Sequence, residues 1–159
     1  PACRRILFLY GEAYRHDELD VSTHAAIRDM FNRSNLRTFR HLTDIARRRM
    51  VVDRNGENSY VQPRNAKNIR VPVTLVQGTR NGLFLPTGLT ASLQWLRENM
   101  DDPDLVVPLL LEGYGHMDTF IGRTTYDGEA RRPGDLPGTF KRIHRALRRG
   151  VSAYEPQGS

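Results

Sequence analysis

Two short apolar runs constrain the fold of this chain more than any other feature. Residues 71–78 form a β-branched, mostly apolar run that stops at Gly78, and residues 105–111 form a second run that contains Pro108. Runs of this length that are apolar at successive positions are typical of strands buried on both faces of a parallel sheet. Proline cannot donate a hydrogen bond to a neighbouring strand, so we expect the second run near a sheet edge.

Helical periodicity surrounds the two runs. Apolar residues recur at helical spacing over residues 3–10, 26–31, 36–46, 89–96 and 136–147. Gly11 can end the first of these helices, and the candidate N-caps of the later ones are Ser22 or Thr23, Ser34 and Thr87. The order from residue 71 onward is therefore strand, helix, strand, helix, which predicts a βαβα unit with parallel strands.

Between the first helices and the first strand, the sequence predicts a boundary. Residues 53–56 give a turn signal, and residues 55–68 are rich in Asn with too few apolar side chains to predict a regular element. We expect a helical, cap-like segment at 1–66, the terminal βαβα unit at 67–150 and a flexible tail at 151–159.

The predicted fold class is α/β, and the fold is expected to be incomplete. Two strands alone do not make a stable sheet, and only helices are predicted upstream of them. The 159 residues also fall short of the roughly 200 to 250 that many α/β folds use. The chain starts at Pro1 with neither an initiator Met nor a signal sequence, so we expect a truncated start. The missing strands would come from upstream sequence or from another chain.

Composition narrows the classes of partner. The formal net charge of +6 comes almost entirely from arginine, and the arginine runs lie at predicted helix ends without interleaved aromatic residues, so we expect no nucleic-acid binding. No stretch approaches the roughly 18 to 20 apolar residues of a membrane span. A single cysteine excludes an internal disulfide, which is compatible with a reducing, cytoplasmic location.

The carboxyl ends of the predicted strands carry the candidate site. Functional groups of open α/β sheets gather at this edge, where the loops at residues 78–86 and 113–118 would meet. The second loop presents His116 just past a strand. A histidine in that place, with an orienting acid after the preceding strand, is typical of the last part of an α/β-hydrolase triad, which runs Ser, Asp or Glu, then His.

At these residues the sequence resembles a known family. The stretches 69–78, 83–86 and 113–122 resemble the C-terminal third of acid-lipase-like α/β-hydrolases. They are more similar still to the hydrolase-like module at the C-terminus of polypeptides that begin with a glucose-methanol-choline oxidoreductase of cholesterol-oxidase type. The cap region of those proteins resembles several upstream stretches, namely 3–10, 23–24, 35–36, 39–42, 52–53, Asn58 and Tyr60. The resemblance covers nearly all of residues 2–122.

The resemblance implies roles for three residues. His116 matches the triad histidine, and the acid position falls at Arg80 or Asn81, neither of which is acidic. Asn81 could hold the imidazole through Nδ1, although an Asn in place of a triad Asp typically costs about 10⁴ in kcat through the wrong tautomer. Asp118 is either a helix N-cap, its more common role, or a stand-in carboxylate. No serine stands in Gly-x-Ser-x-Gly, and the family places its nucleophile upstream.

The other reactive side chains give no comparable signal. His16, His24, His41 and His144 lack metal-binding spacing, so we expect them to be surface or packing residues and predict no metal site. Cys3 lies on an apolar helical face and is expected to be a small buried apolar residue. The 113–115 segment resembles a phosphate loop only loosely and no cofactor-binding residue is predicted.

Three functions follow as hypotheses. In the first, the chain is a C-terminal hydrolase-like fragment for an ester or lipid-type ligand, inactive alone because it lacks the nucleophile. In the second, it is the tail of a flavin-dependent sterol or alcohol oxidoreductase, whose FAD would bind only to an upstream part, since no Gly-x-Gly-x-x-Gly occurs here. In the third, it is a noncatalytic module that binds another protein through strand edges and apolar helices.

Overall fold

A parallel pair of strands forms the centre of the molecule, as the two apolar runs predicted. In the computed structural model, which describes residues 2–31, 35–126 and 138–154, strand β1 (Val73–Gly78) pairs with strand β2 (Val106–Leu111). The strands are parallel and in register from Val73 opposite Val106 to Gly78 opposite Leu111. Both therefore end at the same edge, where the candidate loops begin.

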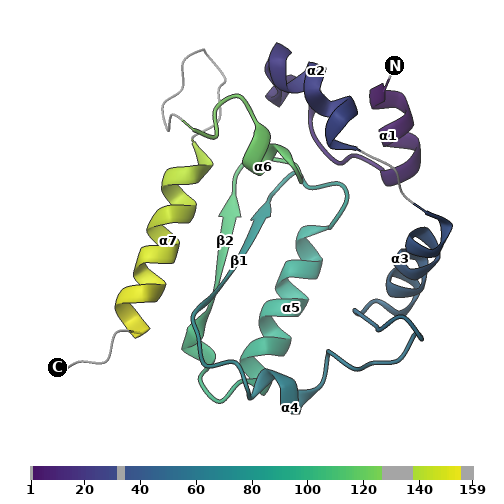
Figure 1. Ribbon diagram of the computed structural model, residues 1–159. Coiled ribbons are helices and arrows are strands. Elements are labelled where there is room, and N and C mark those ends of the chain that lie inside the picture. Colours follow the sequence, from purple (N-terminus) through teal and green to yellow (C-terminus); the bar gives the residue numbers. More distant parts are fainter. Residues whose placement is uncertain (1, 32–34, 127–137, 155–159) are drawn as a thin grey trace.

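Helices cover the two strands, as expected for a βαβα unit. Helix α5 (Pro86–Asn99) and the short 3-10 turn η2 (Pro103–Leu105) connect β1 to β2, and helix α7 (Thr139–Tyr154) follows them. Figure 1 shows the strands between α5 and α7. The core on the α5 side is built from buried Ala66, Met100 and Val106, with Leu93 and Leu96 packed against them.

A second core joins the N-terminal helices to the loop after β2. Its buried residues come from helix α1 (Ala2–Tyr10), the connection that contains the 3-10 turn η1 (His16–Glu18), and helix α2 (Val21–Met30). Met117 and Ile121, on either side of the start of the short helix α6 (Asp118–Ile121), pack against this cluster. Helices α1 and α2 and their connection thus pack against the segment that carries His116.

The remaining N-terminal elements are more exposed. Helix α3 (Leu36–Arg48) has no buried residue, and the His41 imidazole is bonded through Nε2 to the Val52 carbonyl at 2.9 Å. The turn at 53–56 is present, with the Gly56 amide donating to the Asp53 carbonyl and Gly56 at φ +81°. Within the segment predicted to lack regular structure, residues Pro63–Ala66 form the short helix α4, which starts at a proline.

Several helix boundaries differ from the predictions. Asp20 caps α2 in place of Ser22 or Thr23, because its carboxylate accepts the Thr23 amide at 2.7 Å. Asn35 caps α3, and Ser34 lies outside the described residues. Helix α5 begins at Pro86 instead of behind Thr87, since a proline at the first helical position needs no capping partner for a backbone N–H.

The end of the chain also differs. Helix α7 starts at Thr139 and continues to Tyr154, into the segment expected to be a tail, while Leu136 lies outside the described residues.

None of the helices in the described part of the chain has the length and apolar character that crossing a membrane requires.

The described residues form a mixed α/β structure with a two-stranded parallel sheet. Strand β2 exposes apolar side chains, with Val107 43% and Leu110 45% accessible to solvent. Pro108 lies in the middle of β2 opposite Leu75 and is exposed, which agrees with an edge position.

Candidate functional site

The loops after β1 and β2 lie against each other at the carboxyl edge of the sheet. The Thr79 amide donates to the Leu111 carbonyl at 3.0 Å, and the Arg80 amide donates to the Tyr114 carbonyl at 2.9 Å. In the opposite direction, the Gly113 amide donates to the Thr79 hydroxyl at 3.0 Å. Gly113 has φ +80°, a conformation that favours glycine and lets the chain turn directly after the strand. The two loops are therefore held together by their backbones.

This arrangement brings together two of the three predicted site residues. Nδ2 of Asn81 lies 3.2 Å from Nδ1 of His116. Asn81 is only 6% exposed, while Arg80, the other residue at the predicted acid position, is exposed. The side chain that meets the histidine ring is thus Asn81.

The orientation of the Asn81 amide is set by its other bonds. Its oxygen Oδ1 accepts the backbone amides of Leu83 at 3.0 Å and Phe84 at 2.9 Å. An oxygen that accepts two N–H donors leaves the NH₂ group as the part that faces His116. Nδ1 of His116 must then accept, so the neutral ring carries its proton on Nε2.

This tautomer is the reverse of the one a serine triad uses. In a triad, the acid accepts Nδ1–H and leaves Nε2 with the lone pair that takes the serine proton. Here Nε2 carries the hydrogen and is a hydrogen-bond donor. The geometry suits a group that binds an acceptor oxygen better than one that removes a proton.

The surroundings of His116 favour the neutral ring. The residue is half-buried, and its ring centroid lies 5.1 Å from that of Phe84. Burial lowers the pKa of His116 below its usual value, and the negative charge of Asp118 opposes this shift in part. The imidazole is therefore a neutral donor at pH 7.

Asp118 is not the N-cap of the helix that follows His116. Helix α6 begins at Asp118 itself with Met117 at the cap position, so the predicted N-cap is off by one residue. The fully buried carboxylate accepts the Gly115 amide at 2.7 Å and the Arg15 amide at 3.2 Å. Among the hydrogen bonds of the described residues none joins Asp118 to His116. Asp118 shapes the His116 loop and fastens the N-terminal segment to it.

The hydroxyls of Ser22, Ser59 and Ser92 each donate to a group other than His116. The Ser22 hydroxyl donates to Asp20 at 2.7 Å, that of Ser59 to Asp53 at 2.8 Å and that of Ser92 to the Gly88 carbonyl at 2.8 Å. Each of these bonds is local to an exposed segment outside residues 78–86 and 113–118. The Thr119 hydroxyl, three residues after His116, donates to the His116 carbonyl at 2.7 Å.

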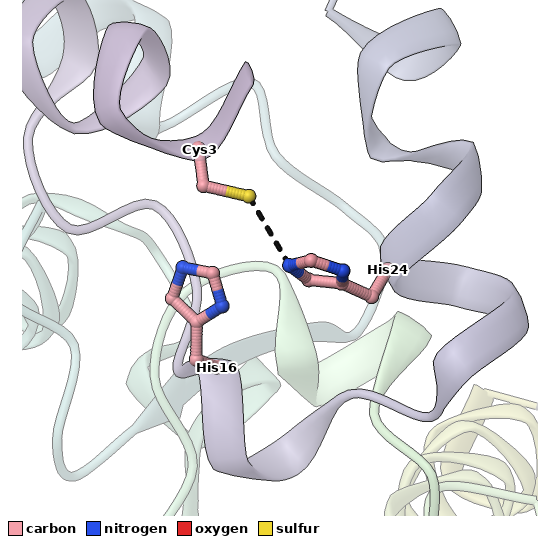
Figure 2. Close-up of side chains that lie close together, drawn as sticks. All are labelled: Cys3, His16 and His24. Carbon is pink, nitrogen blue, oxygen red and sulfur yellow. Dashed lines mark hydrogen bonds between the residues drawn. The ribbon is translucent and has the colours of Figure 1, made fainter. Parts of the chain in front are cut away.

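A second group of reactive side chains lies in the N-terminal region, where the histidine spacing predicted no metal site. Sγ of Cys3 lies 3.3 Å from Nε2 of His24, and the ring centroids of His16 and His24 are 5.1 Å apart. Figure 2 shows the three side chains converging from separate elements. They come from α1, η1 and α2, so no short spacing in the sequence could have revealed them. Cys3 packs on the core only in part, and its thiol meets a histidine.

Residues 13–18 connect the two groups. The Met117 amide donates to the Ala13 carbonyl at 2.8 Å, and the Arg123 amide donates to the Glu18 carbonyl at 2.7 Å. The Arg15 guanidinium also donates to the Gly113 carbonyl at 2.9 Å. The connection that carries His16 is thus hydrogen-bonded directly to the loop that carries His116.

No protein-family model, curated protein or solved structure matches the chain.

Proposed function

We propose that this chain is the histidine-bearing arm of an α/β-hydrolase-like module that binds an ester or lipid-type ligand and does not cleave it alone. One observation carries the proposal: Asn81 and His116 meet at 3.2 Å where two parallel strands end. Ligands of open α/β sheets bind outside this edge. The resemblance to acid-lipase-like hydrolases in residues 69–78, 83–86 and 113–122 supports the same placement.

The chemistry of the ring favours binding. A neutral imidazole with hydrogen on Nε2 can donate to the carbonyl oxygen of an ester or to a carboxylate. Phe84, 60% exposed, lies against the ring, and its neighbour Leu85 is 64% exposed. These side chains offer apolar surface beside the donor, which suits the hydrocarbon part of such a ligand.

Cleavage of an ester bond would need a nucleophile and a different tautomer of His116. A serine hydroxyl would have to be supplied from outside the described residues, and the His116 ring would have to present a lone pair at Nε2. A ring with its lone pair at Nε2 carries hydrogen on Nδ1, and Nδ1 could then no longer accept the hydrogen bond from Asn81. We therefore propose binding as the activity of this chain and hydrolysis, at most, as the activity of a completed module.

A second candidate function has an observation of its own. The sheet has two strands in the described residues, and exposed apolar side chains, among them Val107 and Leu110, lie on β2. Such strands are typical of an interface with further strands or with a partner protein. A noncatalytic interaction module therefore stays the alternative. A place in a flavin-dependent oxidoreductase polypeptide would be by association only, because no dinucleotide fingerprint occurs in the chain.

The test combines turnover and ligand binding on the whole chain. We expect no hydrolysis of nitrophenyl esters above background, and we expect octanoate or methyl octanoate to shift the ¹⁵N resonance of His116 Nε2. His41→Gln is the matched control for His116→Ala, because the His41 ring is hydrogen-bonded to the Val52 carbonyl and lies outside the two site loops. Esterase turnover that His116→Ala abolishes would overturn the noncatalytic assignment.

A different outcome would favour the interaction module. In that case, neither octanoate nor its methyl ester perturbs His116, and light scattering finds a self-associated species that dissociates when Leu110 is replaced by a polar residue. A monomer with cooperative unfolding that binds neither probe would contradict both proposals.

A further inference from the structure

We propose that Cys3, His16 and His24 form a binding site for a tetrahedral metal ion, Zn²⁺ foremost, with the fourth position open to water. The three side chains come from α1, η1 and α2 and converge on one point, as Figure 2 shows. Their potential ligand atoms all lie within 4.8 Å of one another. This site is separate from the His116 site and does not depend on its function.

The distances fit a zinc ion after small side-chain rotations. With Zn–S of about 2.3 Å and Zn–N of about 2.1 Å, tetrahedral geometry places sulfur and nitrogen about 3.6 Å apart. Sγ of Cys3 and Nε2 of His24 are 3.3 Å apart. His16 and His24 are exposed, which leaves room for such rotations, while Cys3 is partly buried.

The donor set selects the class of metal. One thiolate and two imidazoles suit a borderline-soft ion such as Zn²⁺ or copper, whereas Mg²⁺ and Ca²⁺ require oxygen ligands. The nearest acid along the chain, Asp17, is engaged in an ion pair with Arg15. Three protein ligands with an open fourth position are the arrangement found in catalytic zinc sites, whereas structural sites use four.

An unsatisfied buried group next to the cluster points to the same ligand. The Tyr14 side chain is 6% exposed, and its hydroxyl has no hydrogen-bond partner among the described residues. Cys3 packs against the cluster that contains Tyr14, so the Tyr14 hydroxyl is placed to donate a hydrogen bond to a Cys3 thiolate, the form of cysteine that binds metal. The Tyr14 ring also packs against that of His16, with centroids 5.4 Å apart.

Cobalt substitution tests the site on the full chain. Co²⁺ bound by one thiolate and two imidazoles in tetrahedral geometry gives a thiolate-to-metal charge-transfer band and intense visible bands. We expect one equivalent of Co²⁺ to produce both, and Zn²⁺ to abolish them. Weak, octahedral-type absorption without a charge-transfer band would overturn the proposal, as would saturable binding of copper with no response to Zn²⁺ or Co²⁺.

The Zn²⁺ affinity of substituted chains shows which side chains bind the metal. Loss of an outer hydrogen-bond partner typically costs 10- to 100-fold in metal affinity, so loss of a ligand is expected to cost at least about 100-fold. We expect that loss for Cys3→Ser, His16→Gln and His24→Gln, about tenfold for Tyr14→Phe, and none for the control His41→Gln. Unchanged Zn²⁺ affinity in Cys3→Ser and His24→Gln would refute the site.

A second measurement needs no variant. Cys3 is the sole cysteine of the chain, so alkylation by iodoacetamide reports on this thiol alone. We expect Zn²⁺ to slow the alkylation of the folded wild-type chain and a chelator to restore it. An alkylation rate that does not change over a range of Zn²⁺ concentrations would mean that the thiol is only a hydrogen-bond partner of His24.

Discussion

The backbone at Gly78 passes so close to Tyr114 that a Cβ built on Gly78 would lie 2.2 Å from the Tyr114 carbonyl oxygen. Gly78 is the last residue of β1, and Tyr114 belongs to the loop that presents His116. This close approach allows the two loops to exchange backbone hydrogen bonds. The absence of a side chain at position 78 is thus a condition for the contact between Asn81 and His116.

We expect Gly78→Ala to destabilise the chain and to separate the two site residues. Crowding of backbone atoms of this kind typically costs about 1–3 kcal/mol in the free energy of unfolding. Urea denaturation measures that cost. Gly88→Ala is the matched control, because a Cβ there meets nothing within 4 Å and Ala is the better helix former by up to about 1 kcal/mol. Equal effects of the two substitutions would contradict the close approach.

Asn81→Asp should reverse the tautomer of His116. A carboxylate oxygen can keep the amides of Leu83 and Phe84 as donors, while the other oxygen accepts from Nδ1–H of the ring. We expect the hydrogen to move from Nε2 to Nδ1 and the pKa of His116 to rise, because the new negative charge favours the imidazolium. Two-bond ¹H–¹⁵N NMR spectra report both changes.

The control for this experiment is Asn55→Asp, which adds the same charge in the exposed turn at 53–56. It should leave the ring resonances in place. If wild-type His116 already carried its hydrogen on Nδ1, the assigned orientation of the Asn81 amide would be wrong.

Glu18 makes the free energy of unfolding depend on pH, and the sign of that dependence follows from the burial of its carboxyl group. The residue is 4% exposed, and its Oε2 has no hydrogen-bond partner among the described residues. Burial raises the pKa of Glu18, Arg123 opposes the shift, and Asp17 and Asp118 add to it. The folded state thus binds the proton more tightly than the unfolded chain, and stability falls as pH rises from the unfolded value of 4.5 through the folded value.

We expect Glu18→Gln to remove that loss and to be more stable than the wild type at neutral pH. Urea denaturation at a series of pH values gives the comparison. Glu112→Gln, at an exposed position, should follow the wild-type profile. A Glu18→Gln variant whose stability fell just as steeply with pH would show that another group causes the dependence.

The sequence predicted those features that depend on local pattern. The apolar runs at 71–78 and 105–111 identified both strands and their parallel direction, and the shared edge followed from that direction. The predicted caps failed where several polar residues compete: Asp20 outcompetes Ser22 because its carboxylate reaches the Thr23 amide and accepts the Ser22 hydroxyl as well. Helix propensity does not distinguish such neighbours.

Features that depend on distant parts of the chain could not be predicted. The contact between Asn81 and His116 joins residues 35 positions apart, and the Asp118 carboxylate accepts the amide of Arg15, 103 positions away. The convergence of Cys3, His16 and His24 depends on how α1 and α2 pack. The family resemblance and the function it implies stay proposals.

Asp118 links the stability of the fold to the titration of His116, and Asp118→Asn should affect both. Its two oxygens each accept a backbone amide, from Gly115 and from Arg15, so the NH₂ group of Asn must face a donor. A buried donor left without its acceptor costs about 1–3 kcal/mol, and we expect a loss of that size in urea denaturation. The pKa of His116 should fall further, because the charge of Asp118 holds it up.

The exposed Asp104 provides the control, since Asp104→Asn removes the same charge where no side-chain bond depends on it. That variant should match the wild type in stability and in the NMR titration of His116. The two readouts for Asp118→Asn separate its roles, because a loss of stability alone follows from the broken amide bonds, whereas the fall in the His116 pKa follows from the missing charge. A folded Asp118→Asn chain whose His116 titrated higher than in the wild type would contradict the electrostatic relationship between these residues.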